Sequence, residues 1–170
     1  MQTFARAADG RLLVHFYEGH RALLEMLLTE VRELIRSEAG GHRVTERLFP
    51  RAYLDPTEDV AEAEWQALVH DELVQAKVGA FDDVLAYLRR GEEGPGGVIE
   101  LRLDAGEEEH LLAALNDLRL VLAELTGADA PDAAGTREPA GGAVDTTMLL
   151  EWLADLLSEL VDLKLSELPE

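Results

Sequence analysis

The sequence predicts a mainly α fold (α+β), with four to five helices, a small antiparallel β-sheet and a C-terminal helix after a flexible linker. Long stretches carry apolar residues at helical spacing, two regions have strand character, and one late region is small, polar and broken by proline. We therefore expect a mainly helical domain with a small sheet over residues 1–126, a flexible linker over 127–143, and a C-terminal helix within 144–170 that packs on the same domain or on a partner.

The strand candidates lie at the amino terminus and just after residue 97. Phe4 to Arg6 and Arg11 to Phe16 flank Asp9-Gly10, a dipeptide that readily forms a tight hairpin turn. Val98 to Leu103 is the third candidate. Because an isolated strand leaves its backbone polar groups unpaired, we expect this segment to join the hairpin in one antiparallel sheet.

The first half of the chain contains two helical regions separated by an irregular segment. Apolar residues recur at helical spacing from Glu18 to about Glu38, and the segment from Gly41 to Asp55 shows no regular pattern. A second helical region begins at Asp55-Pro56, where Asp suits the N-cap position and Pro the first helical position. It continues to about Leu88, and Gly79 marks either a kink or a break between two helices.

Two more helices complete the prediction. Asp104 and Glu107 have the spacing of a capping box, which starts a helix that runs to Leu125 and stops at Gly127. The last helix, from Asp145 to about Leu165, is apolar around much of its circumference.

The composition excludes several classes of function. The chain carries 35 acidic and 15 basic residues, a formal charge of −20, and no cysteine. A surface this acidic repels phosphate groups, so we expect no unaided DNA binding and no association with anionic membranes. The missing cysteine excludes thiol catalysis, disulfides and cysteine-ligated metals. Because no stretch approaches a membrane span and the amino terminus lacks a secretory apolar region, we expect a cytoplasmic protein.

No residue pattern supports catalysis or cofactor binding. Glu107 and His110 form one Glu-x-x-His pair, the type that di-metal bundles carry on two helices, but the sequence has no second copy. The acidic first turn of that helix is better explained by its favourable interaction with the helix dipole. No serine or threonine stands in a nucleophile pattern. We therefore predict a protein that is not an enzyme and has no catalytic, cofactor-binding or metal site.

Asn116 and Arg119 stand out as polar residues one turn apart on a strongly hydrophobic helix. A guanidinium buried at the edge of a core requires a carboxylate partner, and Glu64 and Glu72 on the preceding helical region are the candidates. The favoured interpretation is a structural polar pair that fixes helix packing. A role in ligand binding is the alternative.

Five arginines form the locally basic part of the chain, and we expect them to neutralise neighbouring acids rather than to bind an acidic partner or nucleic acid. They are Arg32, Arg36, Arg43, Arg47 and Arg51.

The last helix is expected to form an interface, because its apolar residues cover more than the roughly 100° arc that one buried face requires. We predict a homodimer whose contact includes Leu149, Trp152, Leu153 and Leu156. The flexible linker permits exchange of this helix between two chains, although the prediction does not require exchange.

Three segments together resemble an actinobacterial family long catalogued as a domain of unknown function, which includes the AosR-like oxidative-stress transcriptional regulators. The similarity spans almost the whole chain and rests on helical packing patterns. Its segments are Ala114 to Leu125 (ALNDLRLVLAEL), Tyr53-Leu54-Asp55 with Trp65 and Leu68 downstream, and Leu150-Glu151-Trp152-Leu153.

The resemblance implies a role in transcription, exerted at least partly through protein partners such as a sigma factor or RNA polymerase. Regulators of this family that sense oxidants are understood to use a cysteine pair, which this chain does not have. We therefore expect a non-enzymatic, transcription-associated regulatory protein that binds protein partners without thiol sensing. The alternative is a homo-oligomeric structural scaffold with no transcriptional role.

Overall fold

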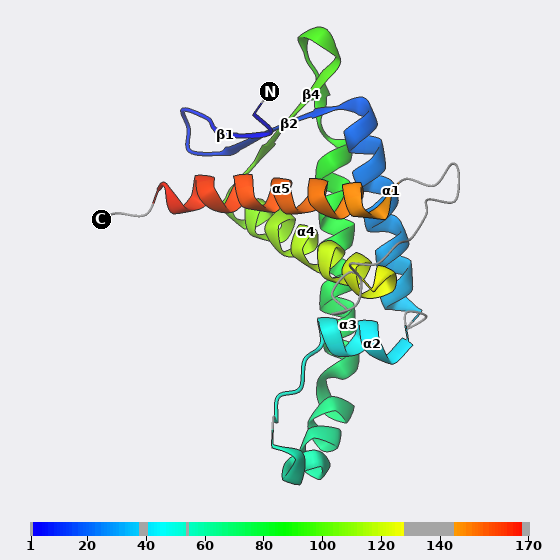
Figure 1. The fold of residues 1–170 in the computed structure, drawn as a ribbon. Coiled ribbons are helices and arrows are strands. Elements are labelled where there is room, and N and C mark those ends of the chain that lie inside the picture. Colours follow the sequence, from blue (N-terminus) through cyan, green and yellow to red (C-terminus); the bar gives the residue numbers. More distant parts are fainter. Residues whose placement is uncertain (1, 38–40, 54, 128–144, 168–170) are drawn as a thin grey trace.

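The helices of the chain pack against one face of a small sheet (Figure 1). The structure is a computed structural model, and it describes residues 2–37, 41–53, 55–127 and 145–167. These residues confirm the mainly α fold with a small antiparallel sheet (Figure 1). The helical elements are α1 (Glu18–Arg36), α2 (Gly41–Leu48), the 3-10 turn η1 (Pro56–Glu58), α3 (Asp59–Arg89), the 3-10 turn η2 (Pro95–Gly97), α4 (Ala105–Thr126) and α5 (Thr146–Leu165).

The predicted hairpin and the later strand form one antiparallel sheet. Strand β1 (Phe4–Arg6) pairs with β2 (Leu12–Tyr17), and Gly10 takes a φ of 83° in the turn between them. Strand β4 (Val98–Leu103) pairs with the other edge of β2, from Leu12 opposite Leu103 to Tyr17 opposite Val98. A two-residue strand that the sequence did not reveal, β3 (Glu92–Glu93), extends the order to β1-β2-β4-β3.

The sheet buries one face against the helices. Leu12, Val14 and Phe16 alternate along β2 and are all buried, because successive side chains of a strand point to opposite faces. Leu101 and Leu103 continue the same apolar face on β4. This face belongs to the hydrophobic core that α1, α3, α4 and α5 complete.

The helices cross one another around this core. Helices α1 and α3 run side by side in opposite directions, and α4 and α5 cross them beneath the sheet (Figure 1). The amino-terminal end of α5 is capped by Asp145, whose side chain accepts a hydrogen bond from the Thr147 amide at 3.0 Å. The predicted linker falls mainly at residues 128–144, which lie outside the described residues.

The segment predicted to be irregular, Gly41 to Asp55, contains the short helix α2. Val44 and Leu48 are buried one turn apart, and Phe49 follows them into the core. Two apolar positions in eight residues are too few to establish a helical period from sequence. Packing against α4 stabilises this helix. The prediction that the segment is irregular was therefore wrong for α2.

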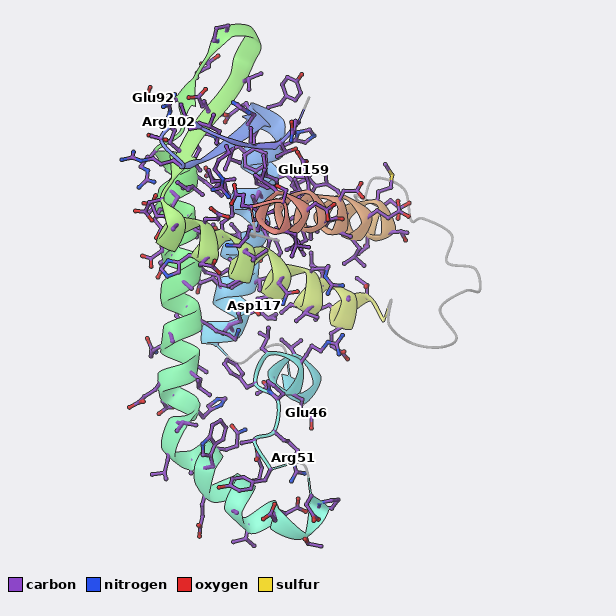
Figure 2. The ribbon with its side chains drawn as sticks, turned by 90° about the vertical axis from the view of Figure 1, so that its left-hand side faces the viewer. Glu46, Arg51, Glu92, Arg102, Asp117 and Glu159 are labelled. Atoms are coloured by element: carbon purple, nitrogen blue, oxygen red, sulfur yellow. The ribbon has the colours of Figure 1, made fainter. Side chains whose placement is uncertain are left out.

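Helix α3 continues through Gly79 without a break, which resolves the alternatives left open by the sequence. Its buried apolar residues begin at Val74 and continue at helical spacing to Leu88. Between Asp59 and Leu73 the buried residue is Glu62, not an apolar one. The amino-terminal half of α3 therefore extends beyond the core, as Figures 1 and 2 show.

Helix α4 begins at the capping box that the sequence predicts. The Asp104 side chain accepts a hydrogen bond from the Glu107 amide, and the Glu107 side chain accepts one from the Asp104 amide, both at 3.0 Å. Gly127 ends the helix with a φ of 68°, a left-handed conformation that glycine adopts without steric cost.

We expect Asp104→Ala to lower the free energy of unfolding by about 1 kcal/mol, because one amide of the first turn loses its acceptor. Urea denaturation followed by circular dichroism measures the change. Asp55→Ala is the matched control, since Asp55 caps an exposed 3-10 turn outside the core, and a smaller effect is expected there. Equal losses in the two variants would contradict this prediction.

Candidate functional site

An open groove of about 600 Å³ lies between α4 and α5. Leu112 and Leu157 supply apolar walls, and the half-exposed Val161 lies at its surface. Small side chains leave the space between the two helices open. The groove is lined by Glu109, Leu112, Ala113, Asn116, Arg119, Ala154, Leu157, Ser158 and Val161.

Asn116 and Arg119, the two polar residues singled out from the sequence, both line this groove. Asn116 is exposed and Arg119 is half-buried. Within the described residues neither side chain has a hydrogen bond or an ion pair. The sequence-based hypothesis that Arg119 pairs with Glu64 or Glu72 is therefore wrong for the described chain.

The orientation of α4 explains this difference. Asp117 faces α3 and its carboxylate accepts a hydrogen bond from Lys77 Nζ at 2.6 Å (Figure 2). Each helical residue turns the side chain by about 100°, so Arg119 points about 200° away from Asp117. Lys77 and Asp117 form an ion pair between α3 and α4, whereas Arg119 faces α5.

A cluster of charges lies at one end of the groove. Glu108 is buried, and its carboxylate accepts hydrogen bonds from the Arg6 guanidinium at 2.7 and 3.3 Å. Lys164 on α5 lies 3.4 Å from Glu108 and bonds to Glu109 as well. Arg6 also donates to Glu167 at 2.8 Å. The cluster joins β1, α4 and the end of α5.

The pKa values in this cluster follow from burial and pairing. Burial raises the pKa of the Glu108 carboxyl, but Arg6 and Lys164 outweigh burial and hold it below its ordinary value. The hydrogen bond to Glu109 raises the pKa of Lys164 despite partial burial. Glu108 is therefore ionised at neutral pH, and its charge is compensated within the chain.

A second carboxylate fixes α5 on the sheet. Glu159 accepts hydrogen bonds from the backbone amides of Thr3 at 2.7 Å and Phe4 at 3.0 Å, and Figure 2 shows it on the side of α5 nearest the hairpin. These bonds satisfy amides at the edge strand of the sheet. Together with the charge cluster, they fix the wall of the groove that α5 provides.

The four residues predicted to form a dimer contact are covered largely by their own chain. Leu149, Leu153 and Leu156 are buried in the core, with exposures of 8%, 0% and 4%. Trp152 is partly buried, and its ring lies 5.8 Å from that of His20. A dimer that uses these residues therefore requires exchange of α5 between chains. The large apolar side chains that α5 leaves exposed are Met148, Val161 and Leu165.

The Glu-x-x-His pair is occupied by structural contacts. Glu107 pairs with Arg90 at 2.7 Å, and this hydrogen bond lowers the pKa of the Glu107 carboxyl. The His110 ring stacks on Tyr87, and its Nδ1 atom lies 3.1 Å from the tyrosine hydroxyl. No group of three potential ligands with metal-binding geometry is found among the described residues.

The locally basic segment is partly neutralised by neighbouring acids, as expected. Arg32 pairs with Asp82 at 2.6 Å, Arg36 pairs with Glu33, and Arg51 pairs with Asp59 at 2.6 Å. Arg47 also has a partner, and the side chain of Arg43 lies outside the described part.

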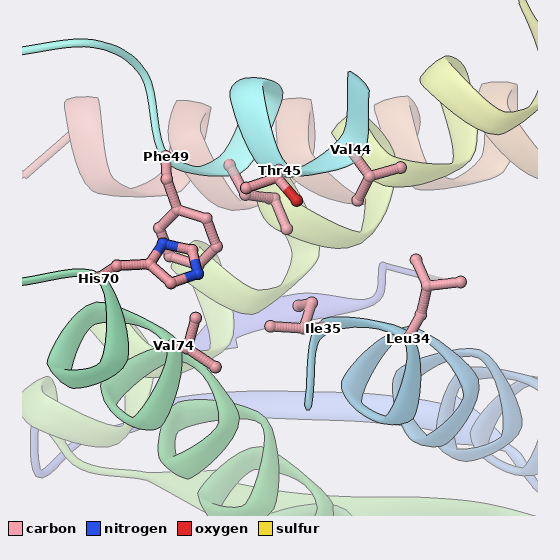
Figure 3. A pocket seen from close by; sticks show the side chains of 8 residues that line it. Leu34, Ile35, Val44, Thr45, Phe49, His70 and Val74 are labelled. Atoms are coloured by element: carbon pink, nitrogen blue, oxygen red, sulfur yellow. The ribbon is translucent and has the colours of Figure 1, made fainter. Parts of the chain in front are cut away.

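A second cavity, between α1, α2 and α3, is small and nearly closed. Its volume of about 10 Å³ holds at most one water molecule. The His70 and Phe49 rings meet edge to face at 5.5 Å (Figure 3). We interpret this cavity as a packing gap rather than a ligand site. It is lined by Leu34, Ile35, Val44, Thr45, Leu48, Phe49, His70 and Val74.

The family model described as "Domain of unknown function (DUF2017)" matches residues 1–163. The chain belongs to this family. No curated protein and no solved structure gives a significant match to the chain. Among the described helices of this DUF2017 protein, none has the length and apolar character needed to cross a membrane.

Sequence reasoning found Asn116 and Arg119 but missed the opposite wall of the groove. Ala154 and Ser158 are small residues one turn apart on α5. Ala113 and Asn116, one turn apart on α4, line the groove from the other side. Small residues at helical spacing on two helices were the available signal. Periodicity alone does not show that the two rows face each other.

Proposed function

We propose that this DUF2017 protein is a non-enzymatic regulator that acts by binding other proteins, with the α4/α5 groove as a binding site. The observation that carries the proposal is Arg119, a half-buried guanidinium without a carboxylate partner in the described part of a chain with a net charge of −20. Most other arginines of the described chain have acidic partners. An unpaired arginine in a groove is suited to bind a carboxylate from another molecule.

The groove favours a protein segment as the ligand. Leu112, Leu157 and Val161 offer apolar surface, while Asn116 and Ser158 offer donors and acceptors for a backbone. A segment with an apolar side chain and a nearby Asp or Glu would satisfy both features. The resemblance to AosR-like regulators supports a transcriptional context for this binding, with a sigma factor or RNA polymerase as the partner.

The same proposal includes a cytoplasmic location and no unaided DNA binding, because the acidic surface repels phosphate. It excludes thiol sensing, because the chain has no cysteine. Any regulation by oxidants would not act through a thiol of this chain.

We expect Arg119→Glu to abolish partner binding while changing the free energy of unfolding by less than about 0.5 kcal/mol, because the side chain makes no intramolecular ion pair. The experiment is a pull-down from the native bacterium, with thermal denaturation of the same samples. Arg89→Glu is the matched control, since Arg89 is an exposed arginine on α3 with the same change of charge. Partner capture that survives Arg119→Glu would contradict the role of the groove.

The second candidate is a homo-oligomeric scaffold without a transcriptional role. Three exposed apolar residues on α5, Met148, Val161 and Leu165, favour it. The homodimer predicted from the sequence is compatible with either candidate. Because its contact residues are largely covered by their own chain, it would exchange α5 between chains. Capture of polymerase or sigma subunits in the pull-down supports regulation, whereas self-association without other partners supports the scaffold.

A further inference from the structure

The amino-terminal half of α3 presents an unpartnered apolar surface at the end of the molecule opposite the sheet. Residues 59–73, which we call the α3 arm, extend beyond α2 (Figure 1). At 1.5 Å per residue the arm is about 22 Å long. None of its apolar side chains is buried.

The arm carries the two most exposed large apolar side chains of the described chain. Leu68 is 78% exposed and Val60 is 74% exposed. They lie eight residues apart, with Glu64 between them and Glu72 one turn further on, so the four side chains form one strip at four-residue spacing. Single exposed apolar residues are common, but these two are the most exposed large ones of the described chain and lie on one strip of a projecting helix.

The arm is held in place although, apart from Leu73 at its end, it lies outside the core. The Glu62 carboxylate accepts hydrogen bonds from the amides of Ala52 at 3.0 Å and Tyr53 at 2.9 Å, and from Gln66 Nε2 at 2.8 Å. Arg51 adds an ion pair to Asp59. These contacts join the segment before η1 to the inner side of the arm and leave the outer strip uncovered.

The charge of the arm determines the chemistry of its partner. Residues 55–72 contain seven acidic residues and no lysine or arginine. Within the described chain, Glu64, Asp71 and Glu72 make no ion pair. A second copy of the arm would bring these carboxylates against the same carboxylates, and anionic lipid or nucleic acid would be repelled as well.

We propose that the α3 arm is a docking surface for a basic amphipathic segment of another protein. The apolar residues of that segment would contact Val60 and Leu68, and its lysine or arginine residues would pair with Glu64 and Glu72. An amphipathic helix fits because its own apolar positions repeat every three to four residues. This surface is separate from the α4/α5 groove, so the protein would hold two partner segments at once.

Tryptophan fluorescence tests the proposal, because the chain has two tryptophans and one of them, Trp65, is on the arm. In a Trp152→Phe variant, Trp65 alone reports binding. The ligand is a synthetic amphipathic helix of leucine and lysine, titrated in about 0.15 M salt, where long-range charge effects are screened. We expect a saturable shift of Trp65 emission, and no shift with the same peptide carrying glutamate in place of lysine.

Leu68→Ser in this background should weaken binding about tenfold or more, because a buried leucine is lost from the contact. Met26→Ser is the control, since Met26 is an exposed apolar residue on α1. Glu64→Gln with Glu72→Gln should also weaken binding, whereas Glu92→Gln with Glu93→Gln, an equal change of charge on β3, should not. Circular dichroism confirms that each variant is folded.

Equal weakening by both pairs of glutamine variants would show attraction to net charge alone and would overturn the proposal. Binding that Leu68→Ser does not change would overturn it too. Self-association through Leu68, seen by light scattering without peptide, would assign the strip to a second copy instead. Arg119→Glu should leave the Trp65 response unchanged, so failure of the groove and failure of the arm are distinguishable.

Discussion

Leu153→Ala is expected to lower the free energy of unfolding by about 3 kcal/mol, because it removes a fully buried side chain and leaves a cavity. Leu153 has 0% exposure in the core between α5 and the rest of the chain. Urea denaturation measures the loss. Met148→Ala is the matched control on the same helix, since Met148 is 66% exposed and should change stability by less than about 0.5 kcal/mol.

The same experiment decides how α5 is packed. If α5 packs on its own chain, the unfolding midpoint of the wild type is independent of protein concentration. If two chains exchange α5, the midpoint rises with concentration, because association stabilises the folded form by mass action. A concentration-dependent midpoint that Leu153→Ala abolishes would support the exchanged dimer and the scaffold function.

Glu108→Gln is expected to lower the free energy of unfolding by about 2 kcal/mol at neutral pH, because a buried acceptor of charged hydrogen bonds is lost. The side chain of Glu108 is 4% exposed, and it bonds Arg6 and Lys164. Glu109→Gln is the control, because Glu109 also pairs with Lys164 but is 63% exposed. We expect a much smaller change there.

The effect of Glu108 should depend on pH in a defined direction. The pKa of Glu108 is lower in the folded chain than in the unfolded chain, so the unfolded chain takes up the proton first as the pH falls. The stabilisation is therefore complete above the ordinary glutamate pKa and is lost as the pH falls through the lower, folded pKa. The difference between wild type and Glu108→Gln should shrink in acid. A difference independent of pH would show that the charge of Glu108 does not contribute.

Local signals in the sequence determined the elements of this fold. The Asp9-Gly10 turn, the Asp104 capping box and the helix end at Gly127 each depend on only a few neighbouring residues. They can therefore be predicted from the sequence without a structure. The apolar period of α5 predicted its bounds closely. Helix α2 was not predicted from the sequence, because its apolar residues are too few to form a pattern. Its packing on α4 stabilises it.

Tertiary structure decided the rest, because the decisive contacts join residues far apart in the chain. The partner of Glu108 is Arg6, 102 positions away, and no local pattern predicts a buried glutamate there. Asn116 and Arg119 were recognised from sequence, but the rotation of α4 against α3 places Asp117 beside Lys77 and Arg119 in the groove. A helical period identifies which residues share a face. Which face meets a neighbouring helix depends on how all the helices pack together.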